Sequence, residues 1–370
     1  MKVIICIPTL LIGGTEIQTL NLAQTLLQAG HEVVTVCYFE HSETMIANYQ
    51  QIGSRVVLFS PSGERKSGWR CIAVLFKKLR QLVRTEKPDV VHVQYMAPGA
   101  IPIILLKLMG VKKIVATLHT SGDIYKNLGL IHFLQRYCVK AFTCITELAE
   151  KSFFGSSLLY TENFQLKSHN HFTIYNALPP YIKIRKNERT FTEVLTIGVV
   201  SRLEEIKGMD LIIPAFKELR SKYNCIRLLI VGDGSLKPQM EKLAVAENLE
   251  KDIQWAGRQN QEKLQDYYDQ IDILCMPSRS EGFGLTAIEG MARGCVVVAS
   301  NIGGLPEVVK NEVVGVLHES ENLNGMVDAI SSLIENRNDL DRLSRKARAY
   351  AQNFVHERYS NLINNLYKKL

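Results

Sequence analysis

The chain has 370 residues, more than one hydrophobic core usually supports, so two domains are expected. Its composition is that of an ordinary globular protein and excludes a collagen-like or low-complexity chain. The formal charge of +7 is uneven: residues 1–190 contain 22 Lys and Arg against 12 Asp and Glu, a net of +10, and the remainder carries −3. A basic N-terminal half suits anionic lipid, nucleic acid or a phosphorylated substrate, although scattered, solvated side chains would give the same total.

The eight cysteines include no C-x-x-C pair, and most stand in apolar runs, where cysteine acts as a small hydrophobic residue. This usage favours a reducing compartment over a disulfide framework. The apolar run at residues 2–7 is too short for a signal-peptide core, and the run at residues 101–106 is too short for a membrane span. The sequence therefore predicts a cytoplasmic protein whose membrane contact would be peripheral.

The first 40 residues predict the start of a doubly wound parallel sheet. An apolar strand at residues 3–7 is followed by a glycine turn, by helical spacing over residues 17–27, and by a second strand at residues 32–38. Such sheets bind ligands at the carboxyl ends of their strands, so Gly13 and Gly14 are expected at the ligand edge. The turn does not match G-x-G-x-x-G, which counts against a nicotinamide site.

A basic amphipathic helix is predicted next, because apolar residues recur at helical spacing from Trp69 to Val83 among many Lys and Arg residues. Such a helix can lie on a membrane surface, but it more often covers a sheet, and the second interpretation is preferred here. Strands predicted at residues 89–94 and 113–120 continue the series. His119 falls at the carboxyl end of the second of these strands, either as a structural histidine or as a ligand contact.

Residues 178–193 are polar and lack apolar periodicity, which predicts a domain linker. A second series of strands and helices then begins with a strand at residues 194–200. Arg202 follows this strand and Lys207 precedes the next helix, so two cations at the strand edge suit a diphosphate, or they form an ordinary exposed pair. A later strand at residues 253–257 ends at Arg258.

Residues 278–292 are the best candidate for the chemistry. They follow a buried strand at residues 271–276, and helical spacing begins near Gly284. The N–H groups and dipole of the first helical turn make an anion site, which a glycine backbone can approach closely. Glu281 and Glu289 would repel a phosphate, so they are predicted to accept hydrogen bonds from hydroxyl groups. A phosphate cradle with two hydroxyl acceptors describes a sugar nucleotide, whereas a helix start with two solvated acids is the alternative.

No metal site is predicted. His169 and His171 lack a third ligand at metal-binding spacing. The D-x-D triplet at residues 339–341 opens a surface helix and is interpreted as its N-cap.

Taken together, these motifs resemble the retaining glycosyltransferases of family 4, and the resemblance covers essentially the whole chain. The family's E-x7-E element corresponds to Glu281 and Glu289, and its G-G-x-E turn to residues 13–16. Its histidine segment corresponds to residues 117–119, and its diphosphate clamp to residues 201–203 with Lys207 and Gly208. The resemblance implies an α/β protein of the GT-B fold, with two Rossmann-like doubly wound parallel-sheet domains facing an interdomain cleft.

The resemblance also implies a domain organisation. Residues 1–180 would form an acceptor-binding domain onto which the C-terminal helix, residues 356–370, packs back. Residues 181–355 would form the nucleotide-sugar-binding domain. The family's usual P-N-G-V-D segment before the linker is replaced by Tyr175-Asn176-Ala177-Leu178-Pro179, a departure at the hinge rather than at the donor site.

Roles for individual residues follow from the same resemblance. Arg202 and Lys207 would neutralise the leaving diphosphate. Glu281 would accept from hydroxyls of the donor sugar, Glu289 from the ribose diol, and His119 would contact the transferred sugar near its reacting carbon. The remaining donor-binding residues would be Gly14, Arg258, Phe283, Gly284 and Leu285.

The predicted reaction is retaining transfer of a hexose from a UDP- or GDP-sugar to a hydroxyl of a glycan or lipid-linked glycan of cell-surface polysaccharide synthesis, without cofactor or metal. Acceptor contacts are expected in residues 60–67 and 121–127. The alternatives are a sugar-nucleotide epimerase or phosphorylase-like enzyme on the same fold, and a non-catalytic nucleotide-binding scaffold. No nucleic-acid partner is predicted, because basic and aromatic residues do not interleave in a recognised motif.

Overall fold

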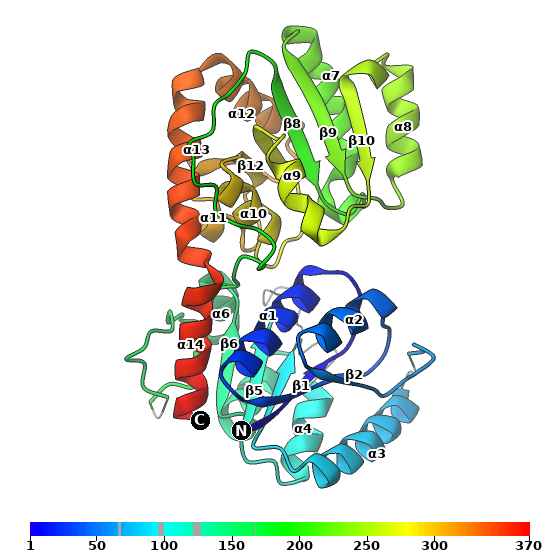
Figure 1. Cartoon of the computed structure of the whole chain (residues 1–370), viewed down its shortest axis with the longest axis vertical. Coiled ribbons are helices and arrows are strands. Elements are labelled where there is room, and N and C mark those ends of the chain that lie inside the picture. Colours follow the sequence, from blue (N-terminus) through cyan, green and yellow to red (C-terminus); the bar gives the residue numbers. More distant parts are fainter. Residues whose placement is uncertain (66–67, 95–99, 121–126, 167) are drawn as a thin grey trace. The chain divides into compact units, whose positions relative to one another are not determined.

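Two parallel β-sheets form the framework of the protein, one in each of two units of the chain (Figure 1). Unit 1 comprises Met1–Ala177 and His356–Leu370, and unit 2 comprises Leu178–Val355. The structure, a computed structural model, describes residues 1–65, 68–94, 100–120, 127–166 and 168–370. Each unit is described by itself below.

The sheet of unit 1 has seven parallel strands in the order β3-β2-β1-β4-β5-β6-β7. Successive side chains of β1, the third strand in this order, enter different clusters of the core: Ile4 and Cys6 pack in one, Ile5 and Ile7 in the other. This alternation is the two-residue period expected of a strand covered on both faces. The strands are β1 (Lys2–Ile7), β2 (Glu32–Cys37), β3 (Arg55–Leu58), β4 (Val90–Gln94), β5 (Ile114–Leu118), β6 (Ala141–Cys144) and β7 (His171–Thr173).

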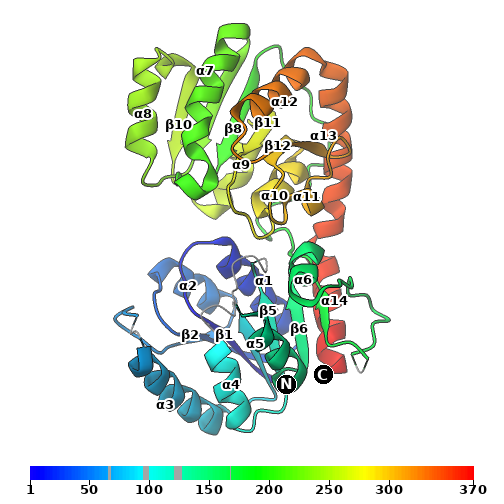
Figure 2. The same cartoon turned by 180° about the vertical axis from the view of Figure 1, so that it is seen from behind.

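Helices cover both faces of this sheet (Figures 1 and 2). Helices α1 (Gly14–Gln28), α2 (Glu43–Gln51) and α14 (His356–Lys369) contribute to the cluster of Ile5. Helices on the opposite face contribute to the cluster of Ile4: α3 (Gly68–Glu86), α4 (Ala100–Leu108), α5 (Leu128–Phe133), the π-helical segment η2 (Leu134–Cys138) and α6 (Glu147–Phe154). The C-terminal helix α14 therefore completes the core of the unit that contains the N-terminus.

The sheet of unit 2 has six parallel strands in the order β10-β9-β8-β11-β12-β13. They are β8 (Leu195–Val200), β9 (Ile226–Val231), β10 (Ile253–Gly257), β11 (Ile273–Met276), β12 (Val296–Ser300) and β13 (Gly315–His318). The helices are α7 (Ile212–Lys222), α8 (Lys237–Ala246), α9 (Leu264–Tyr268), α10 (Leu285–Arg293), α11 (Leu305–Val308), α12 (Leu323–Glu335) and α13 (Arg337–Ala351). Single 3-10 turns are η3 (Glu205–Lys207), η4 (Met209–Leu211), η5 (Glu250–Asp252), η6 (Gln261–Lys263) and η7 (Gln352–Phe354). Residues from α7, α8, α12 and α13 share one hydrophobic cluster with the sheet.

The interpretation of the basic amphipathic helix as a sheet cover is confirmed, because Leu75, Leu79 and Leu82 of α3 are buried in the core of unit 1. The N-cap predicted at residues 339–341 is wrong. Helix α13 is capped by Asn336, whose side chain accepts from the N–H of Asp339. The amide of Asn336 also donates to the Asp339 carboxylate at 2.7 Å, so Asp339 serves as the cap's partner in the first turn. No helix in the described part of the chain combines the length and the apolarity needed to cross a membrane.

Candidate functional site

The turn between β11 and α10 is the centre of the candidate site in unit 2. Helix α10 begins at Leu285, close to the predicted start, and its N-cap Gly284 has a left-handed backbone with φ +95°. A Cβ at this position would lie 2.8 Å from Leu305 Cδ2, the end of a flexible side chain, so the left-handed backbone is the main reason for glycine here. The N–H of Ala287 donates to the carbonyl oxygen of Gly284 at 3.0 Å. The earlier N–H groups of a first helical turn have no partner within the helix, which suits the helix start to an anion.

A second glycine loop packs against this turn. Gly303, in the loop after β12, has φ +56°, and a Cβ there would lie 2.0 Å from the carbonyl oxygen of Glu281. The N–H of Gly304 donates to the same oxygen at 3.1 Å. The loop thus fixes the backbone of Glu281. The sequence analysis did not select this loop, although two adjacent glycines directly after a strand are a signal of such a close approach.

The structure brings two of the predicted residues into direct contact. Lys207 Nζ lies 2.7 Å from Glu281 Oε2, and the two side chains are only 20% and 17% exposed. Lys207 ends η3 in the β8–α7 loop, where Gly208 (φ +66°) follows; a Cβ on Gly208 would lie 1.9 Å from the carbonyl oxygen of Pro277. The loop is therefore held against the end of β11. A basic and an acidic group thus meet beside the start of α10.

Glu289 is buried inside α10, with 6% of its surface exposed. The phenol of Tyr268 donates to Glu289 Oε2 at 2.6 Å. Burial raises the pKa of Glu289 from 4.5 to about 7, and the bond from Tyr268 opposes part of that rise. The pKa of Tyr181 is raised by burial and by the nearby Glu289 charge. The sequence analysis did not select Tyr268, because this residue is one of two adjacent tyrosines in a short helix and belongs to no recognised motif.

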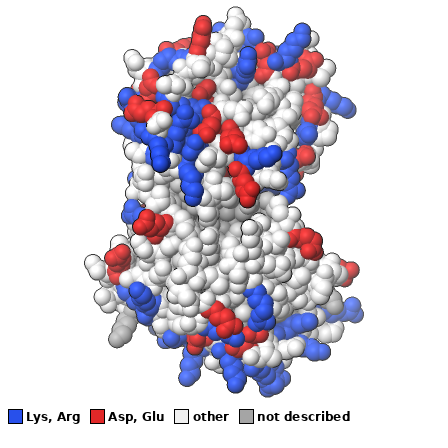
Figure 3. Space-filling view, in the orientation of Figure 1, with Lys and Arg blue, Asp and Glu red and all other residues white. Residues whose placement is uncertain are grey.

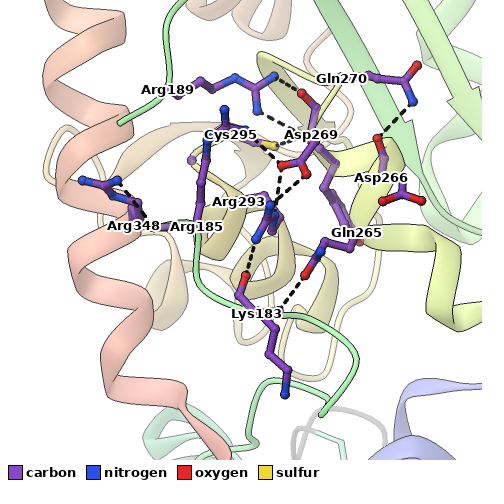
Figure 4. A network of polar contacts seen from close by, with 12 residues as sticks. Lys183, Arg185, Arg189, Gln265, Asp266, Asp269, Gln270, Arg293, Cys295 and Arg348 are labelled. Carbon is purple, nitrogen blue, oxygen red and sulfur yellow. Dashed lines mark hydrogen bonds and ion pairs between the residues drawn. The ribbon is translucent and has the colours of Figure 1, made fainter. Parts of the chain in front are cut away.

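A network of polar contacts surrounds Asp269, the residue that follows Tyr268 in the sequence (Figure 4). Arg293, in the last turn of α10, donates from Nε and Nη2 to the two oxygens of Asp269 at 3.0 and 2.8 Å. Arg185 donates to Asp269 Oδ1 at 3.1 Å, and Arg189 donates to the carbonyl oxygens of Tyr268 and Asp269 at 3.2 and 3.0 Å. The predicted linker segment is therefore bonded to the end of α9, directly beside the residue that contacts Glu289.

The other predicted residues of unit 2 differ in their surroundings. Arg202 is exposed in the loop after β8, on the same connection as Lys207. Arg258 is exposed directly after β10, two strands away from β8 in the sheet. Phe283 is buried and its ring packs edge-on against Phe354, so only its backbone can serve a ligand. Leu285 is half-buried at the first position of α10.

Two predicted residues belong to unit 1. Gly14 is exposed at the first position of α1. His119 directly follows β5 and is 7% exposed, and its Nε2 lies 2.8 Å from Oε1 of Gln94 at the end of β4. Burial lowers the pKa of His119 to about 4, so the imidazole is neutral near pH 7. The sequence analysis did not select Gln94, because a single polar residue at the end of a strand matches no motif.

Part of the predicted acceptor loops, residues 66–67 and 121–126, lies outside the described residues. Across the described ranges, no three His, Cys, Asp or Glu side chains gather as a metal site would require.

Two units, each built around a parallel sheet, are the architecture of the GT-B fold, so the two predicted Rossmann-like domains are confirmed. A family model described as "Glycosyl transferases group 1" matches residues 181–350, and one described as "Glycosyltransferase Family 4" matches residues 12–150. The chain therefore belongs to the family 4 glycosyltransferases, and it is an enzyme that transfers glycosyl groups.

Individual proteins agree with this assignment. An uncharacterized glycosyltransferase of Methanocaldococcus jannaschii is 26% identical over 97% of this chain and 95% of its own. The solved structure of Anabaena HepE in complex with UDP-glucose has a TM-score of 0.80 at 18% identity and covers 100% of both chains. A lipopolysaccharide outer core galactosyltransferase, WaaB in its apo form, has a TM-score of 0.75 at 17% identity, again over 100% of both chains. At such identities the solved structures share the fold.

Proposed function

We propose that the enzyme transfers a hexose, with retention of anomeric configuration, from a UDP- or GDP-sugar to a hydroxyl of a glycan or lipid-linked glycan in cell-surface polysaccharide synthesis. The observation that carries this proposal is the Lys207–Glu281 pair beside the start of α10, with Glu289 buried in the same helix. A cation, a helix N-terminus and two carboxylates in one site suit a diphosphate that is attached to groups rich in hydroxyls. The similarity in fold to the HepE complex with UDP-glucose supports this choice of donor.

The chemical problem is charge, because the diphosphate becomes more negative as the glycosidic bond breaks. Lys207, exposed Arg202 and the N–H groups of α10 supply a preorganised positive potential at that point, in place of a divalent metal. Glu281 then exchanges part of its contact with Lys207 for hydroxyls of the donor sugar. The attacking hydroxyl approaches from the side of the leaving group, and its proton passes to the leaving phosphate.

The remaining residues hold the donor. Glu289 accepts from the ribose diol, Arg258 borders the base, and the backbone of residues 283–285 binds the phosphate. On unit 1, the exposed backbone of Gly14 admits the donor phosphate or the acceptor, and His119 contacts the transferred sugar.

Thermal unfolding with nucleotides is the first test. UDP, GDP, CMP, ADP and NAD are each added with and without EDTA, and a ligand at 100 times its Kd adds about 2.7 kcal/mol of stability. We expect one nucleoside diphosphate to raise Tm by several degrees equally in both conditions. Its hexose conjugates are then screened for transfer, and NMR of the product identifies the anomer. Stabilisation by NAD alone, or activity that EDTA abolishes and magnesium restores, would contradict the proposal.

We further propose that the enzyme works at the cytoplasmic face of a membrane, which unit 1 contacts through α3. Besides its buried side, this helix has exposed Trp69 (74%), Ile72 (40%) and Phe76 (41%). Lys and Arg side chains gather at the lower right of Figure 3, where α3 lies in Figure 1. The exposed basic residues of α3 are Arg70, Lys77, Lys78, Arg80 and Arg84. The sole acid of α3, Glu86, is paired with Lys2 and Arg55.

An anionic bilayer fits this surface, because apolar side chains enter the headgroup region while Lys and Arg attract acidic lipids. The double substitution Lys77→Glu/Lys78→Glu should reduce co-sedimentation with phosphatidylglycerol-containing vesicles by about 10-fold or more, since each basic residue contributes about 1 kcal/mol at such a surface. The matched control is Arg345→Glu/Lys346→Glu, an adjacent exposed pair on α13 of unit 2. Equal loss in both double variants, or equal binding to neutral phosphatidylcholine vesicles, would contradict docking through α3.

A further inference from the structure

Gln94 is a buried polar residue with half of its hydrogen-bonding capacity unused. Its side chain is 2% exposed at the carboxyl end of β4, and its amide Nε2 has no hydrogen-bond partner among the described residues. A buried donor without a partner costs about 1–3 kcal/mol, so native proteins rarely keep one without a reason. The carboxyl end of a parallel strand is the edge where such sheets bind ligands, which suggests a reason of this kind.

Neighbouring polar groups in the same sheet are, by contrast, satisfied. His92, two residues earlier on β4, bonds to Tyr367 at 2.8 Å through Nδ1 and to Thr117 at 2.7 Å through Nε2. Thr117 in turn bonds to Thr143 at 2.6 Å. The chain of contacts crosses from α14 to β6, so His92, Thr117 and Thr143 each have a partner. Gln94, at the carboxyl end of β4, differs from these three residues because its amide has no partner among the described residues.

The other half of the Gln94 side chain determines the state of His119. Gln94 Oε1, 2.8 Å from His119 Nε2, can only accept, so Nε2 carries the hydrogen. Burial keeps the pKa of His119 at about 4, so the ring is neutral and Nδ1 retains its lone pair. The two residues together present an acceptor on His119 and a donor on Gln94. Thr120, the next residue, adds a buried hydroxyl that also has no partner in the described chain.

We infer that Gln94 is a second sugar-binding residue: its Nε2 donates to a hydroxyl of the transferred sugar, while its Oε1 fixes His119 in the tautomer whose Nδ1 accepts from the sugar. A hydroxyl both donates and accepts, so a neutral donor–acceptor pair matches a polyol without adding charge. His119 then acts as a neutral acceptor rather than as a proton donor. The inference rests on the proposed function, which takes His119 to lie against the transferred sugar.

The test measures how the sugar contributes to binding, separately from the contribution of the nucleotide. Isothermal titration at pH 7.5 compares UDP with UDP-glucose and GDP with GDP-mannose, for the full chain and for Gln94→Met, which keeps the side-chain volume and removes both polar groups. We expect Gln94→Met to leave the Kd of the nucleoside diphosphate unchanged and to weaken the nucleotide sugar by about 10-fold or more. The control is Gln135→Met, which removes the contact of Gln135 with Asn170 in another part of unit 1.

The ratio of the Kd of the nucleoside diphosphate to the Kd of the nucleotide sugar measures how much the sugar contributes to binding. If the wild type binds a nucleotide sugar and this ratio is the same in Gln94→Met, the inference is overturned. A wild-type chain that binds none of these nucleotides would instead contradict the proposed function, and the inference with it. If Gln94→Met does not fold, two-bond 1H–15N spectra of the 15N-histidine-labelled wild type decide. They should show His119 as the Nε2–H tautomer without titration between pH 5.5 and 8, whereas the Nδ1–H tautomer or a midpoint near pH 6.5 would overturn the inference.

Discussion

At the scale of single residues, Glu289 shows how position in the fold changes the chemistry of a side chain. In the sequence it is one of two equivalent acids in the E-x7-E element. In the structure Glu281 is half-buried and paired with Lys207, whereas Glu289 is buried and bonded to the neutral phenol of Tyr268. Burial raises the pKa of Glu289 to about 7. The two acids are therefore suited to different hydroxyl groups.

The raised pKa makes stability depend on pH. Between pH 4.5 and about 7 the folded state keeps a proton on Glu289 that the unfolded chain has released, so the free energy of unfolding falls as pH rises through this window and is level above it. The total change is about 3 kcal/mol. Glu289→Gln lacks this titrating group. In urea unfolding, the free energy of unfolding of the variant relative to that of the wild type should therefore rise by about this amount between pH 4 and pH 8. If the free energies of unfolding of the two proteins changed in parallel with pH, the pKa of Glu289 would not be raised in the folded state.

Lys207 is the residue on which the proposed electrostatics depend most. Lys207→Ala removes a preorganised cation beside the start of α10, and we expect kcat to fall about 10²-fold or more. Lys217→Ala serves as the control, since Lys217 also forms an ion pair, with Glu247 at 2.6 Å, on the surface of α7. Near-normal kcat in Lys207→Ala, measured with the donor identified by thermal unfolding, would remove Lys207 from the mechanism.

At the scale of elements, glycines set how closely the loops of unit 2 approach one another. Gly208 packs on the end of β11 and Gly303 on the turn before α10, each against a backbone carbonyl that a Cβ would strike. The loops after β8, β11 and β12 therefore form one packed group at the carboxyl edge of the sheet. Local sequence predicted each loop, but their mutual contacts arise only when the strands lie side by side.

Two alanine substitutions measure this packing. Gly257→Ala meets open space, so only its left-handed backbone (φ +66°) opposes the change, at a cost of about 1 kcal/mol. Gly303→Ala has the same backbone problem and also places Cβ 2.0 Å from the Glu281 oxygen, which should cost about 1–3 kcal/mol more. Urea unfolding of unit 2, followed by fluorescence of Trp255, compares the two. Equal losses would show that the Gly303 loop moves freely away from the turn.

At the scale of the whole molecule, the two units have separate cores, and the chain returns to the first after forming the second. Ile363, Leu366 and Tyr367 of α14 are buried with β1 and α1 residues of unit 1. Tyr367 also bonds to His92, which lies 275 positions earlier in the sequence. The stability of unit 1 therefore depends on the last residues of the chain.

Leu366→Ala should reveal that dependence. Leu366 is fully buried, so its truncation should cost about 2–5 kcal/mol. Hydrogen–deuterium exchange should become faster in β1 and β4 of unit 1 and stay unchanged in β8 and β11 of unit 2. Asn361→Ala, on the exposed side of α14, is the matched control. Faster exchange of similar size in both units would contradict separate cores.

The sequence by itself determined the class of fold, the strands and helices that open each unit, and the motif at residues 278–292, whereas α2 and β3 were not predicted. These features are local, because apolar periodicity, glycine turns and helix starts act over a few residues. The cap of α13 by Asn336 rather than Asp339 is also local, because the two residues are three positions apart. Tertiary structure alone decided which groups of separate elements meet: Lys207 with Glu281, Tyr268 with Glu289, and Gln94 with His119. Such contacts, and the burial that shifts a pKa, depend on how elements pack, and no stretch of sequence contains that information.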